Sequence, residues 1–380
     1  MSNSALVSFC LLAVLLAGCS TAPRPNTAQV PDWQERGPEA GRDLPPVTSN
    51  SNHIAADTAG TPHSAGSNSV QPVPRFTAAP TVETWTPLGR WSKANGFAAP
   101  IFLAATPLPS YALRSSQGVL VLHTGNQLAH WDGIELHLGY APQLIGGQPY
   151  VHGLDLRTSL QPLLSGGPAP CLSARPVVVL DPGHGGTDSG THSVLGHYEK
   201  EFTLDWARRL QALLATNGWQ VLLTRSGDFD LALSNRVAFA EEHKADLFLS
   251  LHFNSAAPNQ AEAGLETYVL TPSGMASNLT RGFADDADAL FPNNAFDTQN
   301  LLLAVRVHGA LLQVNGHRDR GVRHARFPGV LRGQQRPAIL VEGGYLSNPR
   351  EAGLIGDGDY RQKLAEAVAG ALETIRRQGT

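Results

Sequence analysis

The feature that most constrains the fold is a continuous apolar run, Val177–Leu180, which leads directly into a glycine-rich turn. Strands buried on both faces have uninterrupted runs of this kind, because helices cover both sides of their sheet. From Glu199 onward apolar residues recur at helical spacing, and strand-like and helix-like segments then alternate. We therefore predict an α/β domain over residues 174–378, with a twisted, mostly parallel sheet and helices on both faces.

The segments expected within this domain alternate regularly. The predicted strands are 177–180, 220–224, 246–251, 264–270 and 338–341. The predicted helices run from Glu199 to the stop signal Asn217-Gly218 and over 234–243, 298–315 and 359–376. Residues 271–297 are expected to form a loop or a mixed stretch. Ligands of such sheets bind beyond the carboxyl ends of the strands, so the residues at those ends are the candidates for chemistry.

Residues 1–19 have the features of an export signal. The apolar stretch Ala5–Leu16 is too short to cross a bilayer but suits the core of a signal peptide. It ends in Leu-Ala-Gly-Cys, which resembles the lipobox of bacterial lipoproteins; an ordinary signal peptide with a chance cysteine is the alternative. We expect Cys19 to be lipidated and the chain to be exported and anchored to a membrane. Ser20, in place of Asp, favours the periplasmic face of the outer membrane if the source has two membranes.

Two segments separate this signal from the α/β domain. Residues 20–80 are rich in Pro, Ser, Thr, Ala, Asn and Gly without an apolar period, so we predict a disordered linker, or tether. Residues 84–168 contain short strand-like runs, such as 118–123 and 134–138, and a helix-like patch at 154–164. We predict a small β-rich or α+β module there, acting as a spacer or a binding module, because it holds no constellation of catalytic residues.

Composition excludes several classes of protein. The net charge is −4, with no long run of one sign, which excludes the basic stripe that nucleic-acid binding needs. Of the three cysteines, only Cys171 belongs to the expected folded part. The folded part therefore has neither an internal disulfide framework nor a thiolate zinc cluster.

Three predicted strands end in turns that carry a histidine or a glutamate: His184, His252 and Glu342. Glu199 opens a predicted helix shortly after the first of these turns. Two histidines and one glutamate are a ligand set of hydrolytic zinc, with one position open for water, and His184, Glu199 and His252 could supply it. Glu342 would then be the group that takes and passes on a proton.

Each of these residues also has a plainer interpretation. A histidine at a strand end is often structural, and the Gly-His-Gly-Gly sequence could be a tight turn. A phosphate loop is excluded because the Lys-Ser/Thr pair that should follow is absent. Glu199 could serve only to favour a helix N-terminus, and Glu342 could be an ordinary loop charge. Spacing alone leaves these alternatives open.

The carboxyl-terminal half resembles the catalytic domain of zinc-dependent N-acetylmuramoyl-L-alanine amidases, in the branch typified by the septal amidases. The matching segments occur in the family's order and cover the whole domain. They are 179–186 (VLDPGHGG), 199–204 (EKEFTL), 222–225 (LLTR), 233–236 (LSNR), 250–254 (SLHFN), 264–270 (GLETYVL), 320–322 (RGV), 330–332 (VLR) and 340–348 (LVEGGYLSN). The 84–168 module weakly resembles the stalk-like domains found ahead of such amidases.

The resemblance implies roles for individual residues. It implies that His184, Glu199 and His252 hold Zn²⁺ and that Glu342 is the catalytic glutamate. Asn254 and Glu266 match family positions near the site, and Asp181 and Arg236 are expected to be structural. The other two residues, His192 and His197, flank the Glu199 segment and match no ligand position.

The resemblance also implies the reaction and the substrate. The expected activity is hydrolysis of the amide between N-acetylmuramic acid and L-alanine in peptidoglycan, for cell-wall remodelling or cell separation. The alternatives are a catalytically inactive wall-binding protein and a zinc carboxypeptidase acting on stem peptides. We expect a monomer whose partners are peptidoglycan and, through Cys19, a membrane.

One departure from the family concerns regulation. Some septal amidases carry a long helical insertion that plugs the zinc site until a partner removes it. Here the corresponding stretch, 271–299, is short. We therefore predict no full plugging helix, and whether an activator protein is needed stays open.

Overall fold

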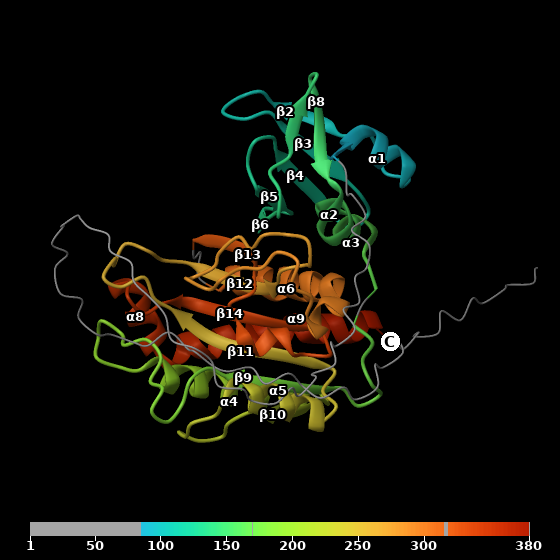
Figure 1. The fold of residues 1–380 in the computed structure, drawn as a ribbon. Helices are drawn as coiled ribbons and strands as arrows, with labels where there is room; N and C mark the ends of the chain where they lie inside the picture. Colours follow the sequence, from blue (N-terminus) through green and yellow to red (C-terminus); the bar gives the residue numbers. More distant parts are fainter. Residues whose placement is uncertain (1–84, 169, 315–317, 380) are drawn as a thin grey trace, which may run out of the picture. The chain divides into compact units, whose positions relative to one another are not determined.

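The computed structural model describes residues 85–168, 170–314 and 318–379, which belong to one compact unit, Glu83–Thr380 (Figure 1). The expected signal peptide at 1–19, the expected lipidation at Cys19 and the expected tether at 20–80 lie outside the described residues. No helix in the described part of the chain is both long enough and apolar enough to span a membrane.

The amino-terminal part, residues 85–165, combines short strands with short helices. Strands β2 to β6 form an antiparallel meander, and β1, β8 and β7 form a separate small sheet. The strands are β1 (Trp85–Pro87), β2 (Ile101–Ala104), β3 (Ser110–Arg114), β4 (Val119–His123), β5 (Leu128–Trp131), β6 (Ile134–His137), β7 (Gln143–Ile145) and β8 (Gln148–His152). The helices are α1 (Leu88–Ala94), then α2 (Gly153–Asp155), a π-helical turn (Leu156–Leu160) and α3 (Gln161–Ser165) in continuous succession.

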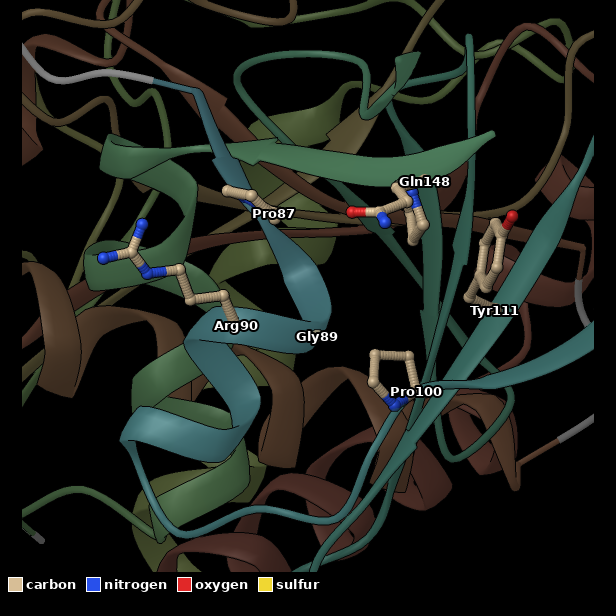
Figure 2. A pocket seen from close by; sticks show the side chains of 7 residues that line it. Pro87, Gly89, Arg90, Pro100, Tyr111 and Gln148 are labelled. Atoms are coloured by element: carbon tan, nitrogen blue, oxygen red, sulfur yellow. The ribbon is translucent and has the colours of Figure 1, made fainter. Parts of the chain in front are cut away.

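A pocket of about 460 Å³ lies within this amino-terminal part (Figure 2). Its lining includes Arg90 of α1, Tyr111 of β3 and Gln148 of β8, together with prolines such as Pro87 and Pro100. All of its lining residues precede residue 150, so the pocket is separate from the candidate residues of the α/β domain.

The α/β domain is built on strands that follow one another in the order β10, β9, β11, β14, β12 and β13 (Figure 1). Their bounds are β9 (Val177–Pro182), β10 (Gln220–Leu223), β11 (Leu247–Asn254), β12 (Leu265–Leu270), β13 (Asp319–Ala325) and β14 (Ala338–Tyr345). The helices are α4 (Glu199–Thr216), α5 (Leu233–Glu242), a 3₁₀ turn (Pro292–Phe296), α6 (Asp297–Leu312), α7 (Gly329–Arg332), α8 (Pro349–Gly356) and α9 (Gly358–Gly379). β13 also pairs in parallel with β6, which joins the two parts of the chain into one sheet.

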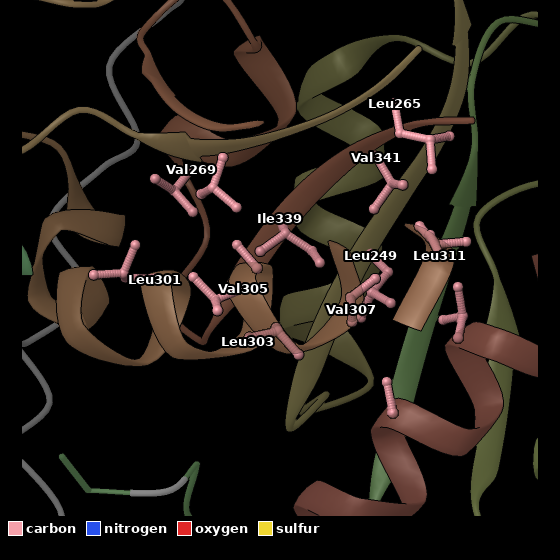
Figure 3. Packing of buried hydrophobic residues seen from close by; sticks show 14 of the residues in the cluster. Leu249, Leu265, Val269, Leu301, Leu303, Val305, Val307, Leu311, Ile339 and Val341 are labelled. Atoms are coloured by element: carbon pink, nitrogen blue, oxygen red, sulfur yellow. The ribbon is translucent and has the colours of Figure 1, made fainter. Parts of the chain in front are cut away.

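Alternate residues of the central strands enter two different cores. Val178 and Leu180 of β9 pack into the large core with α4, α6 and α9, whereas Val179 between them packs into a smaller core with α5 and α7. The same period of two recurs in β14, where Ile339 and Val341 face the large core and Leu340 the smaller one. Figure 3 shows part of the large core, in which leucines and valines of α6 lie near Ile339 of β14. The prediction of helices on both faces of an α/β sheet is confirmed.

The prediction of a mostly parallel sheet holds only in part, because the sheet is mixed. β9, β10, β11 and β14 run in parallel, but β12 runs antiparallel to β14. The connection from the end of β11 to the start of β12, residues 255–264, contains no helix. A chain without a crossover cannot return to the other end of the sheet, so β12 must run in the opposite direction. β13, parallel to β12, shares that direction.

The structure has elements that the sequence pattern did not indicate. The strand β13 and the helices α7 and α8 were not expected. In addition, β14 continues through Tyr345 instead of ending at Val341, so Glu342 lies within a strand and not in the turn after it. The division expected near residue 170 between a small module and the α/β domain stays a prediction, because the described residues form one compact unit.

Candidate metal centre

Three side chains from separate elements converge at the carboxyl ends of β9 and β11. His184 lies in the turn after β9, Glu199 is the first residue of α4, and His252 lies near the end of β11. One nitrogen or oxygen atom from each of them lies within 4.8 Å of the other two, and the two imidazole rings have centroids 4.9 Å apart. The structure therefore brings together the three residues that the sequence proposed as metal ligands.

Glu199 is the buried centre of this group, with 3% of its side chain exposed. Its Oε2 lies 3.1 Å from His184 Nε2, and its Oε1 lies 2.9 Å from His252 Nδ1. The backbone N–H groups of Thr191 and Phe253 also donate to the carboxylate, each at 3.0 Å. These contacts fix both oxygens of Glu199 toward the histidines.

The charges in this group stabilise one another. Burial opposes ionisation of Glu199, but the neighbouring His184 and His252 outweigh that effect and hold the pKa of the carboxyl well below its usual range. Burial also opposes protonation of His184, yet Glu199 and Asp188 raise the pKa of its imidazole to about 10. A carboxylate this firmly ionised, beside two imidazoles, is an arrangement that attracts a cation.

Asp188 is a member of the site that the sequence analysis did not single out. Its Oδ2 lies 2.8 Å from His184 Nδ1, which leaves Nε2 of the same ring directed at Glu199. Carboxylates in this position fix the tautomer and the orientation of a metal-binding histidine. Its position four residues after His184, in the same turn, is a signal from which it could have been found.

The turn that carries His184 is held by a buried ion pair, as expected for Asp181 and Arg236. Arg236 Nη1 lies 2.7 Å from Asp181 Oδ1, and both side chains are almost fully buried. Arg236 also donates to the carbonyl oxygens of Pro182 and His184, each at 2.8 Å. Ser250 of β11 donates to the other carboxylate oxygen of Asp181, so β9, β11 and α5 together fix the turn.

Two glycines leave the space that the histidines occupy. A Cβ atom on Gly183 would lie 2.2 Å from His252 Cε1, and one on Gly190 would lie 2.6 Å from His184 Cδ2 and 2.8 Å from Glu199 Oε2. Gly190 also has a φ of +66°, a conformation that glycine adopts without strain. Any side chain at Gly183 or Gly190 would therefore collide with these residues.

Glu342 lies next to the metal group in the register of the sheet. It is the partner of His252 on the parallel strand β11 and of Glu266 on the antiparallel strand β12. Its Oε2 is buried and accepts no hydrogen bond from the described residues. Burial, only partly offset by the charges of Arg281 and His252, raises the pKa of Glu342 to about 7. A carboxyl group with a pKa near neutrality is suited to exchanging protons.

Asn254 and Glu266 form a buried polar group beside Glu342. Asn254 Nδ2 donates to Glu266 Oε2 at 2.8 Å, and Arg320 Nε lies 2.7 Å from Glu266 Oε1. Arg281, from the segment between β12 and α6, reaches the same place and lies 3.6 Å from Glu342 Oε1. No pattern in the sequence marks Arg281, because the segment around it has no period and its contacts come from distant strands.

The remaining histidines of this region stay outside the group. His192 pairs with Tyr198 in an isolated bridge and stacks on its ring. His197 is 58% exposed and lies 4.0 Å from Glu201. Neither belongs to the group of described residues that could hold a metal ion, which consists of His184, Glu199 and His252.

The donor set fits a divalent metal ion. Two imidazoles and one carboxylate offer nitrogen and oxygen atoms to a single point, and a hydrolytic zinc ion uses such a set with one position left for water. The buried Oε2 of Glu342, which has no partner among the described residues, adds an acceptor next to that point. The site can therefore hold a metal ion and move a proton.

Comparison with known proteins agrees with this geometry. The chain belongs to the N-acetylmuramoyl-L-alanine amidase family (Amidase_3), whose sequence profile matches residues 178–374. It is similar to the N-acetylmuramoyl-L-alanine amidase AmiA of Escherichia coli strain K12, with 33% identity over 214 residues, which cover 51% of this chain and 73% of that protein.

Two further relatives extend the comparison. The N-acetylmuramoyl-L-alanine amidase AmiC of Neisseria meningitidis serogroup B is 32% identical over 265 residues, which cover 59% of this chain and 63% of that protein. The solved structure of the amidase AmiC2 of Nostoc punctiforme is 33% identical, with a TM-score of 0.45, and the match covers 54% of this chain and 99% of that one. The family predicted from the sequence motifs is confirmed.

Proposed function

We propose that this chain is a zinc-dependent N-acetylmuramoyl-L-alanine amidase, which hydrolyses the amide between N-acetylmuramic acid and L-alanine in peptidoglycan. The observation that carries the proposal is the convergence of His184, Glu199 and His252 beside the buried Glu342. The amidase names of its relatives support the same substrate.

His184, Glu199 and His252 would hold the ion, and Asp188 would keep the His184 ring in the orientation that presents Nε2. A divalent metal bound there supplies Lewis-acid activation of water and of the amide carbonyl. The rest of the chemistry belongs to side chains of the chain itself.

Glu342 acts as the base and then as the acid. Its carboxylate takes a proton from the attacking water, and the C–N bond breaks as the same proton passes to the nitrogen of L-alanine. The second proton of the water stays on the new carboxyl group and then passes to the released amine, so the products are a muramic acid carboxylate and a peptide with a terminal ammonium group, and atoms and charge balance. The raised pKa of Glu342 suits both proton transfers, because near neutral pH its carboxylate can accept a proton and its protonated form can give one up.

Mass spectrometry of purified peptidoglycan after digestion tests the proposal. The proposed activity releases intact stem peptides that begin with L-alanine and leaves muramic acid without a peptide. A zinc carboxypeptidase would instead shorten stem peptides that stay on the sugar, and an inactive wall-binding protein would sediment with the wall and release nothing. Either of those two results would overturn the proposal.

We also propose that the chain is exported and anchored through lipidated Cys19, at the periplasmic face of the outer membrane in a cell with two membranes. The support is the Leu-Ala-Gly-Cys sequence at 16–19 and the serine after it. Metabolic labelling with a fatty acid should mark the full chain, and Cys19→Ser should lose both the label and the partition into detergent. A labelled Cys19→Ser protein would contradict the assignment.

A further inference from the structure

Arg281 brings a positive charge to the side of Glu342. Its Nη2 donates to Asn254 Oδ1 at 2.9 Å and to the hydroxyl of Tyr268 at 3.3 Å, and it lies 3.6 Å from Glu342 Oε1. The guanidinium also lies over the ring of Phe327, with 4.8 Å between its central carbon and the ring centroid. One nitrogen of the group is therefore committed to the protein.

The other nitrogens of the guanidinium are available to a ligand. Nε and Nη1 of Arg281 make no hydrogen bond to any described residue, and 36% of the side chain is exposed. Arg320 and Arg323, the other arginines near Glu266, are each only 18% exposed, and Arg320 is already paired with Glu266 and Glu262. Arg281 is thus the arginine of this trio best placed to meet a ligand from solvent.

The segment that carries Arg281 is fixed to the protein although it contains no helix. Arg326, fully buried, pairs with Asp285 and donates to the carbonyl oxygens of Pro272, Met275 and Ala287. Asn278 exchanges two hydrogen bonds with the backbone of His324 in β13.

Arg281 itself has a φ of +46°, a backbone conformation that side-chain-bearing residues rarely adopt. A residue held in such a conformation by its surroundings often serves a site.

The charge of Arg281 contrasts with its surroundings. Arg281 lies beside the buried carboxyl groups of Glu342 and Glu266, and the other cations at Glu266, Arg320 and Arg323, are less exposed. A negatively charged group of a substrate is therefore attracted most readily to Arg281 on this side of the site. A carboxylate that accepts from a free N–H of this guanidinium forms a charge-assisted hydrogen bond, which is stronger than a neutral one.

We propose that Arg281 binds a free carboxylate of the peptide, the one on the residue that follows L-alanine. This inference rests on the proposed function. A carboxylate that accepts from the outer edge of Arg281 lies roughly 6 Å from Glu342 Oε1, one hydrogen-bond length beyond the guanidinium. Each extended residue adds about 3.5 Å, so a carboxylate one residue past the cleaved amide reaches that place.

The test compares two substrates that differ only at this carboxylate. N-acetylmuramoyl-L-alanyl-D-glutamate carries it free, and N-acetylmuramoyl-L-alanyl-D-isoglutamine carries it as an amide. The zinc-loaded full chain should prefer the acid by roughly 10- to 100-fold in kcat/KM, mainly through KM, because a charge-assisted hydrogen bond is lost with the amide. Arg281→Gln should bring the preference close to one, and Arg281→Lys should retain part of it.

Controls and contrary outcomes separate this role from a structural one. Arg350→Gln, on the exposed start of α8, should keep the wild-type preference. The inference would be overturned if Arg281→Gln kept the wild-type preference, if the wild type cleaved both substrates equally well, or if Arg281→Gln raised kcat/KM equally on both. None of these results would question the amidase activity itself. A wild type that cleaves neither substrate nor peptidoglycan would instead overturn the proposed function, and this inference with it.

Discussion

Glu342 and His252 are register partners on the adjacent parallel strands β14 and β11. Side chains of register partners point to the same face of a sheet, so the pairing alone places the proposed base beside the proposed metal ligand. The distance between the base and the metal group is therefore set by the spacing of two neighbouring strands, which loops elsewhere cannot alter.

Removing the carboxylate of Glu342 should separate metal binding from catalysis. Glu342→Gln keeps the size of the side chain but cannot take a proton, so we expect metal content to be unchanged and peptide release to fall by roughly 10²- to 10⁴-fold. The measurements are metal analysis and chromatography of released peptides. Glu201→Gln, at a side chain that is 55% exposed, is the matched control and should stay near wild-type activity. A Glu342→Gln enzyme with nearly full activity would show that another group is the base.

Removing one histidine of the group should abolish metal binding. His184→Ala deletes one of three proposed ligands, and we expect less than one equivalent of zinc after dialysis, together with loss of activity. His197→Ala is the control, because that side chain lies in the neighbouring segment but 58% of it is exposed. Chelation of the wild-type protein should likewise abolish activity, and added zinc should restore it. Equal zinc content in the two variants would argue against the assigned ligands.

Gly183 should tolerate no side chain. A Cβ at this position would meet His252 at 2.2 Å, so Gly183→Ala is expected to displace the ring and weaken zinc binding. Gly353→Ala in α8 is the control, since no atom lies within 4 Å of a Cβ there and alanine favours a helix. Zinc affinity and thermal unfolding of the two variants provide the comparison. Wild-type affinity in Gly183→Ala would mean that the turn can move away from His252.

The buried ion pair beneath the His184 turn should matter more than a surface pair. Arg236→Ala leaves the Asp181 carboxylate buried without its cation, and we expect the free energy of unfolding to fall by about 3–5 kcal/mol. Arg377→Ala removes an arginine that is 76% exposed and pairs with Glu373 one helical turn away, and a change of about 0.5 kcal/mol or less is expected. Urea unfolding of both variants measures the difference, and similar losses in the two would contradict the argument.

His324 should make the folded state sensitive to acid. Burial lowers the pKa of this imidazole to about 4, from 6.5 in an unfolded chain, so the folded state favours its neutral form. Its contribution to stability is fully present above pH 6.5 and is lost as the pH falls toward 4. The contribution is at most about 3.5 kcal/mol, from about 1.4 kcal/mol per pKa unit.

His324→Asn isolates this contribution. An asparagine amide can still donate to the carbonyl oxygen of His137, as His324 Nδ1 does at 3.1 Å, but it does not titrate. Burial also raises the pKa values of Asp155 and Asp297 to about 7. Their contributions to the stability of the folded state therefore change in the opposite direction and are lost as the pH rises. The informative quantity is therefore the difference in unfolding free energy between variant and wild type across pH 4–7. A constant difference would disprove the role of His324.

Much of the α/β domain could be predicted from the sequence because its buried strands have clear apolar patterns. The run Val177–Leu180 had no polar interruption, and the helical spacing after Glu199 was equally clear, so both elements lie where the pattern placed them. β13 escaped detection because Asp319–Ala325 contains one large aliphatic residue, Val322, among arginines and a histidine. The hydrogen-bond and charge partners of those polar side chains lie far away in the sequence, so no local pattern could predict the strand.

The residues of the candidate site also include some that the sequence could indicate and one that it could not. His184, Glu199 and His252 could be proposed because ligand types at strand ends and a helix start point to a common edge of the sheet, and the structure brings them together. Arg281 could not be proposed from the sequence, because its place depends on contacts that Arg326 and His324 make with an aperiodic segment. A full plugging helix was not expected in residues 271–299, where the structure has a 3₁₀ turn and the start of α6, and one side chain from this stretch, Arg281, reaches Glu342.

The pairing of β13 with β6 has a practical consequence for work on shortened proteins. Val322 and Leu136 are partners in this pairing, and the backbone N–H of Glu135 donates to Asp319 at 2.8 Å. A fragment that starts near residue 170 would keep every ligand of the metal group but would leave β13 as an open edge with unpaired backbone groups. Unpaired edges can recruit strands from other copies, so we expect such a fragment to aggregate more readily than the chain that keeps the amino-terminal part.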